Sequence, residues 1–96
     1  MERVQRKRVK GWKMPDNTVY VGRGTIWGNP FVRGIAGNRE EVVRKYRFYL
    51  ERILKENPYF LRPLEGKDLA CWCPLDKVCH ADVLLEKLRL ENGSNT

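Results

Sequence analysis

The residue types best suited to chemistry are concentrated in one short stretch of the chain. All three cysteines and the only histidine lie between Cys71 and His80, in the sequence Cys-Trp-Cys-Pro-Leu-Asp-Lys-Val-Cys-His. A thiolate can act as a nucleophile or a metal ligand, and an imidazole can transfer a proton or bind a metal. Because Cys71 and Cys73 are two residues apart on a predicted strand, their side chains share one face.

Three interpretations of this cysteine–histidine segment (residues 71–80) are open from the sequence. In the first, it forms the floor of a ligand or reaction pocket, where a helix start activates Cys79 and His80 acts as general acid or base. In the second, Cys71, Cys73, Cys79 and His80 together bind zinc. In the third, the cysteines are small core hydrophobes and the histidine is a buried, hydrogen-bonded residue.

We expect no metal cofactor and keep zinc as the alternative. The ligand count suits a site of three cysteines and one histidine, but neighbouring residues at a helix start point about 100° apart. The usual zinc pair of two cysteines separated by two residues is also absent. Three clustered cysteines do not resemble a secreted disulfide framework, so reduced thiols or a metal site fit the count better.

A second candidate element is the glycine-rich loop, residues 22–31. Gly22, Gly24 and Gly28 match neither the P-loop spacing nor the dinucleotide-binding fingerprint. Such a loop can still bind an anion through its backbone N–H groups, with Arg23 beside them. The alternative is a structural turn that places Trp27 in the core.

The segments around these motifs have the patterns of strands and helices. Residues 18–21 and 67–73 have strand character. Residues 38–57 form the clearest helix, with Asn38 as its N-cap and Glu41 completing a capping box. A second helix is expected to begin at Asp76 or Val78. The basic residues before position 13 fit either a disordered arm or a short edge strand.

These segments predict an α/β fold built as one domain over residues 1–96. The domain should contain a short sheet of two to four strands with two main helices, like a fragment of a Rossmann fold. Residues 1–3 and 92–96 are expected to be frayed tails.

The chain is basic, with a formal net charge of +7 and an isoelectric point near 9.6. This charge favours a nucleotide or nucleic acid as partner. No apolar run approaches the ~18 residues of a membrane span, and the first residues lack a signal-peptide pattern. We therefore expect a cytoplasmic protein without a membrane partner, and the oligomeric state stays open.

Three blocks of the sequence resemble one known family. Residues 3–23, the sequence Trp-Gly-Asn-Pro-Phe at 27–31, and residues 71–86 with their Cys-Trp-Cys and Cys-His-Ala-Asp motifs look like the small bacterial and phage proteins grouped as domain of unknown function 4326. A looser similarity, to domain of unknown function 488, covers a strand ending in cysteine, a loop, and Cys-His opening a helix. Neither group carries an established activity, so the resemblance implies which positions form one site and does not imply a reaction.

We predict a small domain that binds a nucleotide or a nucleic-acid-derived phosphate where the glycine-rich loop meets the cysteine–histidine segment. Whether it is an enzyme is left open, with Cys79 and His80 as the catalytic candidates. The alternative is a non-enzymatic nucleic-acid-binding or zinc-stabilised adaptor. The predicted ligand-binding residues are three arginines for phosphate, a tryptophan for stacking, and neighbours that the resemblance groups with them: Arg6, Arg8, Arg23, Trp27, Gly28, Asn29, Cys73 and Asp82.

Overall fold

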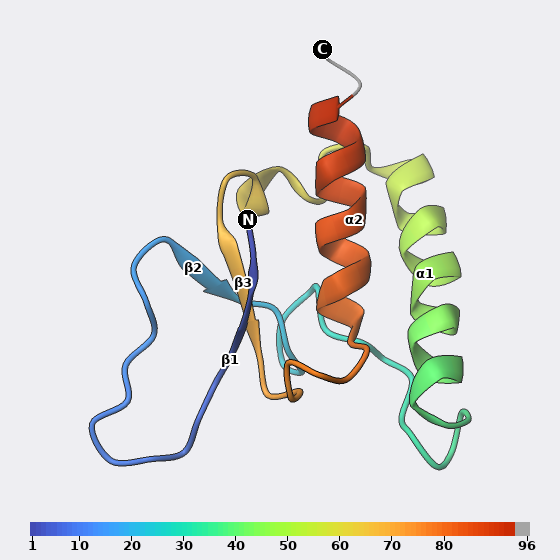
Figure 1. Cartoon of the computed structure of the whole chain (residues 1–96). Coiled ribbons are helices and arrows are strands. Elements are labelled where there is room, and N and C mark those ends of the chain that lie inside the picture. The colour runs from blue at the N-terminus through green and yellow to red at the C-terminus, as the bar shows by residue number, and fades with distance from the viewer. Residues whose placement is uncertain (94–96) are drawn as a thin grey trace.

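The computed structural model of the chain describes residues 1–93, and its centre is strand β3 (Asp68–Cys71). Strands β1 (Arg3–Gln5) and β2 (Thr18–Tyr20) pair with β3 in parallel on either side, which gives the order β1-β3-β2. The residues of β3 after its first are buried, as is usual for the middle strand of a parallel sheet. Because the three strands run in one direction, their carboxyl ends meet at one edge of the sheet (Figure 1).

Two helices complete the fold and confirm the predicted α/β class. Helix α1 (Arg39–Glu56) follows β2, and helix α2 (His80–Gly93) follows β3, with a short helix η1 (Arg62–Leu64) between α1 and β3. Helix α2 packs against both the sheet and α1 (Figure 1). In residues 1–93 neither helix combines the length and the apolar character needed to cross a membrane.

Helix α1 begins as its sequence predicts. The Asn38 side chain accepts the backbone N–H of Glu41 at 2.9 Å, and the Glu41 carboxylate accepts the N–H of Asn38 at 3.2 Å, which makes a complete capping box. The predicted bounds, 38 and 57, are the two cap residues of the observed helix. The buried face of α1 carries Val42, Val43, Tyr46 and Leu50.

Helix α2 begins later than the sequence predicted. It starts at His80 and not at position 76 or 78, because residues 72–79 form turns between β3 and the helix. Asp82 in the first turn accepts the backbone N–H of Cys79 at 3.0 Å, which satisfies one of the free donors at the helix start.

The first residues of the chain are held in place, although residues 1–3 were expected to fray. Met1 packs against the core, and the Glu2 backbone N–H donates to Asp68 Oδ1 at 2.8 Å. Arg3 begins β1, so the basic N-terminal segment contains the edge strand that was one of its two predicted forms. Of the expected C-terminal tail, residues 92 and 93 belong to α2, and residues 94–96 lie outside the described residues.

Candidate functional site

A cavity of about 460 Å³ opens where the strands end. The segment after β2, the start of α1 and the cysteine–histidine segment all line it. This edge of an open parallel sheet is the common place for ligands, and the volume falls within the ~300–1,000 Å³ of small-molecule sites. The glycine-rich loop ends 40 residues before the cysteine–histidine segment begins, yet both motifs face this one cavity.

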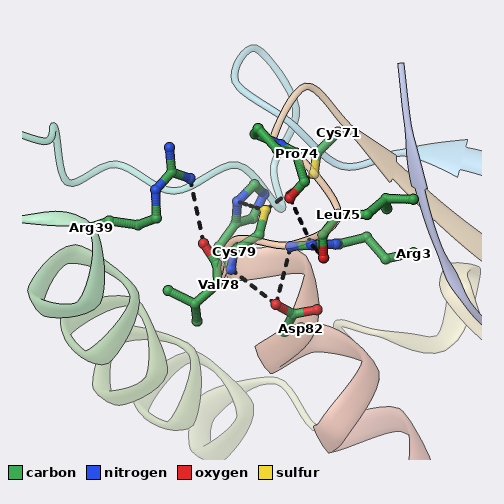
Figure 2. A network of polar contacts seen from close by, with 9 residues as sticks. Arg3, Arg39, Cys71, Pro74, Leu75, Val78, Cys79 and Asp82 are labelled. Carbon is green, nitrogen blue, oxygen red and sulfur yellow. Dashed lines mark hydrogen bonds and ion pairs between the residues drawn. The ribbon is translucent and has the colours of Figure 1, made fainter. Parts of the chain in front are cut away.

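Three arginines line the cavity: Arg23, Arg33 and Arg39. No aspartate or glutamate in the described part of the chain lines it with them. None of the three forms an ion pair with a residue whose side chain the structure describes. Arg23 donates to the Phe31 carbonyl at 3.4 Å, and Arg39 donates to the Val78 carbonyl at 3.5 Å (Figure 2). These bonds are long, and most of the five N–H donors of each guanidinium stay free for a ligand.

The three cysteines converge on the floor of the cavity. Their sulfur atoms all lie within 4.8 Å of one another, and the Cys71 and Cys79 sulfurs are 3.1 Å apart. Cys71 and Cys79 are buried, Cys73 is half-buried, and all three are free thiols. The cluster is therefore a group of ligand atoms open to the cavity on the Cys73 side.

The pKa order within the cluster differs from the sequence expectation, which placed the reactive thiolate at Cys79. Contact with the Cys71 and Cys73 thiols, together with burial, raises the pKa of Cys79. Hydrogen bonds from the Cys71 and Cys79 thiols lower the pKa of Cys73, and Arg39 adds to this effect. Burial and its sulfur neighbours outweigh the small stabilisation that a helix start gives to Cys79.

His80 is held in one orientation by a backbone hydrogen bond. Its Nε2–H donates to the Val21 carbonyl at 2.7 Å, since a carbonyl can only accept, and Nδ1 lies 3.5 Å from the Cys79 sulfur. The ring packs edge-on against Tyr46 with centroids 5.2 Å apart. Burial lowers the pKa of His80, so the ring is neutral and its Nδ1 lone pair faces the cysteine cluster.

Of the predicted site residues in the glycine-rich loop, Arg23 and Asn29 line the cavity, and the Asn29 amide is already bonded. Its Nδ2 donates to the Val42 carbonyl at 3.1 Å, and its Oδ1 accepts the Phe31 N–H at 2.9 Å. The Trp27 ring faces away, because its Nε1–H donates to the Phe60 carbonyl at 3.2 Å. These contacts fasten the glycine-rich loop to the helical layer.

Gly28 allows two backbone segments of the glycine-rich loop to approach each other closely. A Cβ atom at this position would lie 2.7 Å from the Gly22 carbonyl oxygen, so the two backbone segments approach more closely than any other residue allows. Gly28 does not line the cavity, although the next residue, Asn29, does.

The other predicted site residues lie beside the cavity and do not line it. The Arg6 guanidinium stacks 4.6 Å from the centroids of both Tyr20 and Trp72, and Arg8 lies 4.7 Å from that of Trp72. Asp82 binds Arg3, with 3.1 Å between Oδ2 and Nη1. Arg6 and Arg8 thus contact two lining aromatic residues, whereas the Asp82 carboxylate is engaged by β1.

Sequence reasoning missed Arg33 and Arg39 as site residues. Arg39 carried a usable signal: a cation in the first turn of a helix opposes the helix dipole, so its presence there needs another reason. Arg33 lies in an irregular loop, and no local pattern distinguishes it from other exposed arginines.

A comparison with protein families gives one match. A family model described as "Domain of unknown function (DUF4326)" matches residues 4–90 of the 96-residue chain. The match confirms the resemblance seen in the sequence and covers β2, β3, α1 and most of α2. No curated protein and no solved structure matches the chain.

Proposed function

We propose that this chain, which belongs to the DUF4326 family, binds a phosphate-bearing small molecule of the nucleotide class in the cavity beside the cysteine–histidine segment. The single observation that carries the proposal is the charge of the lining. Arg23, Arg33 and Arg39 face a cavity without a compensating carboxylate among the described lining residues.

The arginines suit phosphate in number and in placement. They come from three separate segments, the glycine-rich loop, the loop before α1 and the first turn of α1. A guanidinium offers a planar fork of donors that matches two phosphate oxygens, and such charge-assisted bonds are stronger than neutral ones. A dianionic phosphate between these side chains would offset two of their three positive charges.

The remaining walls suit the uncharged part of a nucleotide. Val42, Val43 and Val78 line the cavity together with the aromatic rings of Tyr20 and Phe31. An apolar surface beside a few oriented polar groups is typical of small-molecule sites. Trp27 was expected to stack on a base, but its ring packs against Phe60. We therefore assign the stacking role to the rings of Tyr20 and Phe31.

Catalysis is not part of this proposal. His80 Nε2 is bonded to the Val21 carbonyl, and Nδ1 faces the Cys79 sulfur. The assignment of Cys79 and His80 as catalytic residues therefore stays a prediction from the sequence, and the binding function does not depend on it.

The experiment is isothermal titration with nucleoside mono-, di- and triphosphates in phosphate-free buffer. Removing one guanidinium contact should cost about 1.5–3 kcal/mol, so Arg23→Gln and Arg39→Gln should weaken binding ~10–100-fold. Arg52→Gln is the matched control, because Arg52 is exposed on α1 and does not line the cavity. Equal losses in all three variants, or no binding of any nucleotide, would overturn the proposal.

The competing adaptor function is tested with single-stranded oligonucleotides. Lys7, Arg8 and Lys10 are exposed in the segment after β1 and could follow a nucleic-acid backbone. Many phosphate contacts make log affinity fall steeply with log salt, whereas a pocket for one ligand responds weakly. A steep slope that Arg39→Gln leaves unchanged would favour the adaptor.

A further inference from the structure

The spacing of the three cysteine sulfurs is close to the spacing in a tetrahedral thiolate site. With zinc–sulfur bonds of about 2.3 Å, neighbouring sulfurs in a tetrahedron lie about 3.8 Å apart. The Cys71 and Cys79 sulfurs are 3.1 Å apart, and all three sulfurs lie within 4.8 Å of one another, so the cluster is of the size that such a site requires. The three sulfurs are therefore near enough to one another to share one ion.

A role as buried core residues is enough to account for Cys71 and Cys79, but it does not account for Cys73. Cys71 and Cys79 are each 1% exposed and belong to the hydrophobic core, where a thiol behaves as a small hydrophobe. Cys73 lies beyond the end of β3 in a turn, half-buried and facing the cavity. Its sulfur joins the other two from the solvent side, which completes a group of ligand atoms.

We propose that Cys71, Cys73 and Cys79 bind a zinc-class divalent ion through three thiolates, with the fourth coordination position facing the cavity. All three residues line the cavity, so the open position would be reached from it. On binding, the three thiols release their protons to solvent and form metal–sulfur bonds. The proposal goes beyond anion binding and does not depend on it.

The sequence argued against zinc because Cys79 and His80 are adjacent and diverge. The structure removes that objection, because the three sulfurs converge without the histidine. His80 Nδ1 lies 3.5 Å from Cys79 but outside the group of atoms that are all within 4.8 Å of one another. We therefore place His80 beside the ion, where Nδ1 can accept a hydrogen bond from a water in the fourth position.

The surroundings of the cluster also fit a charged metal centre. A divalent ion with three thiolates carries one net negative charge, which is costly to bury without a partner. Arg39 lies on the same cavity wall and close enough to interact with Cys73. An open fourth position is the arrangement of reactive zinc sites, in contrast to the closed four-ligand set of structural ones.

The experiment uses the full chain, purified under reducing conditions without chelator and in phosphate-free buffer. Elemental analysis should find one zinc per chain. After its removal, cobalt(II) should bind with one-to-one stoichiometry and give sulfur-to-cobalt charge-transfer bands in the near ultraviolet and tetrahedral bands in the visible range. Added imidazole should shift the visible bands, since it can enter the open position.

Variants assign the ligands. Cys73→Ser should weaken cobalt binding at least ~10–100-fold, since even outer-sphere changes have effects of that size. Val78 lines the same cavity, but its side chain has no ligand atom. Val78→Ala should therefore bind cobalt as the wild type does. Circular dichroism checks the folding of both, and the wild-type cobalt spectrum decides the main point even if Cys73→Ser does not fold.

Two results would overturn the proposal. The first is the absence of both stoichiometric zinc and the cobalt charge-transfer bands. The second is a cobalt spectrum that imidazole does not change and that His80→Gln alters, which would mean a closed site with His80 as fourth ligand. Because no nucleotide is present, neither result bears on the anion-binding proposal.

Discussion

Arg3 on β1 binds Asp82 in the first turn of α2, with 3.1 Å between Nη1 and Oδ2 (Figure 2). The same carboxylate oxygen accepts the backbone N–H of Cys79 at 3.0 Å. The other guanidinium nitrogen of Arg3 donates to the carbonyls of Pro74 and Leu75 at 2.9 and 2.7 Å. One buried side chain of the edge strand therefore holds both ends of the turn that carries Cys73 and Cys79.

The first prediction is that Arg3→Lys destabilises the protein by about 1–3 kcal/mol. Lysine keeps the charge but cannot donate to the carboxylate and both carbonyls at once. Most of the loss should come from the two carbonyls, because the Asp82 side chain is 45% exposed and its ion pair is screened by solvent. Urea unfolding measures the effect, with Arg52→Lys on the exposed face of α1 as control. Equal stability of the two variants would contradict the role given to Arg3.

A second prediction concerns the link between α1 and the glycine-rich loop. The fully buried Tyr46 donates its hydroxyl hydrogen to the Trp27 carbonyl at 2.6 Å. Tyr46→Phe removes this bond and leaves a carbonyl without its partner, so the free energy of unfolding should fall by about 1–2 kcal/mol. Tyr49→Phe is the control, since Tyr49 is half-buried and stacks on Tyr46 through its ring. Thermal unfolding that changes equally in both variants would refute the prediction.

The third prediction is that Gly28→Ala distorts the cavity as well as lowering stability. The added Cβ would meet the Gly22 carbonyl oxygen at 2.7 Å, and backbone cannot move aside as a flexible side chain can. Overpacking of this kind costs about 1–3 kcal/mol, and the displaced loop carries Arg23. We expect a lower melting temperature together with weaker nucleotide binding.

Gly24→Asn gives the matched comparison for Gly28→Ala. Gly24 has φ of +93° with no atom near the position of a Cβ, and asparagine tolerates the left-handed region better than other side chains do. It should lose less stability than Gly28→Ala, and the reverse order would show that the close approach at Gly28 is not what limits the loop.

How far the sequence predicted this fold depends on how local each signal is. Helix α1 was predicted to within its caps because Asn38 and Glu41 complete their bonds within one turn. Strand β1 was left undecided because three residues become a strand only through pairing with β3, Arg3 opposite Leu69. Such pairing depends on a strand far away in the sequence. The residue types near position 3 therefore do not predict it.

The candidate site was predicted in outline for the same reason. Strand ends of a parallel sheet meet at one edge, so the glycine-rich loop and the cysteine–histidine segment could be placed together from their positions after strands. The direction of each side chain could not be predicted. Asn29 turns its amide to the Val42 carbonyl, and Arg6 stacks on Tyr20, because those partners come from other segments.

The last prediction separates Cys73 from Cys79 by accessibility. In reduced, metal-free protein at one neutral pH, iodoacetamide should label half-buried Cys73 first. Cys71 and Cys79, each 1% exposed, should react at least ~10-fold more slowly, because the fold must open locally to expose them. Peptide mass spectrometry against time gives the three rates. Stoichiometric zinc should suppress labelling of Cys73, since a bound thiolate is no longer a free nucleophile. Labelling of Cys79 as fast as that of Cys73 would instead restore Cys79 as the accessible nucleophile that the sequence predicted.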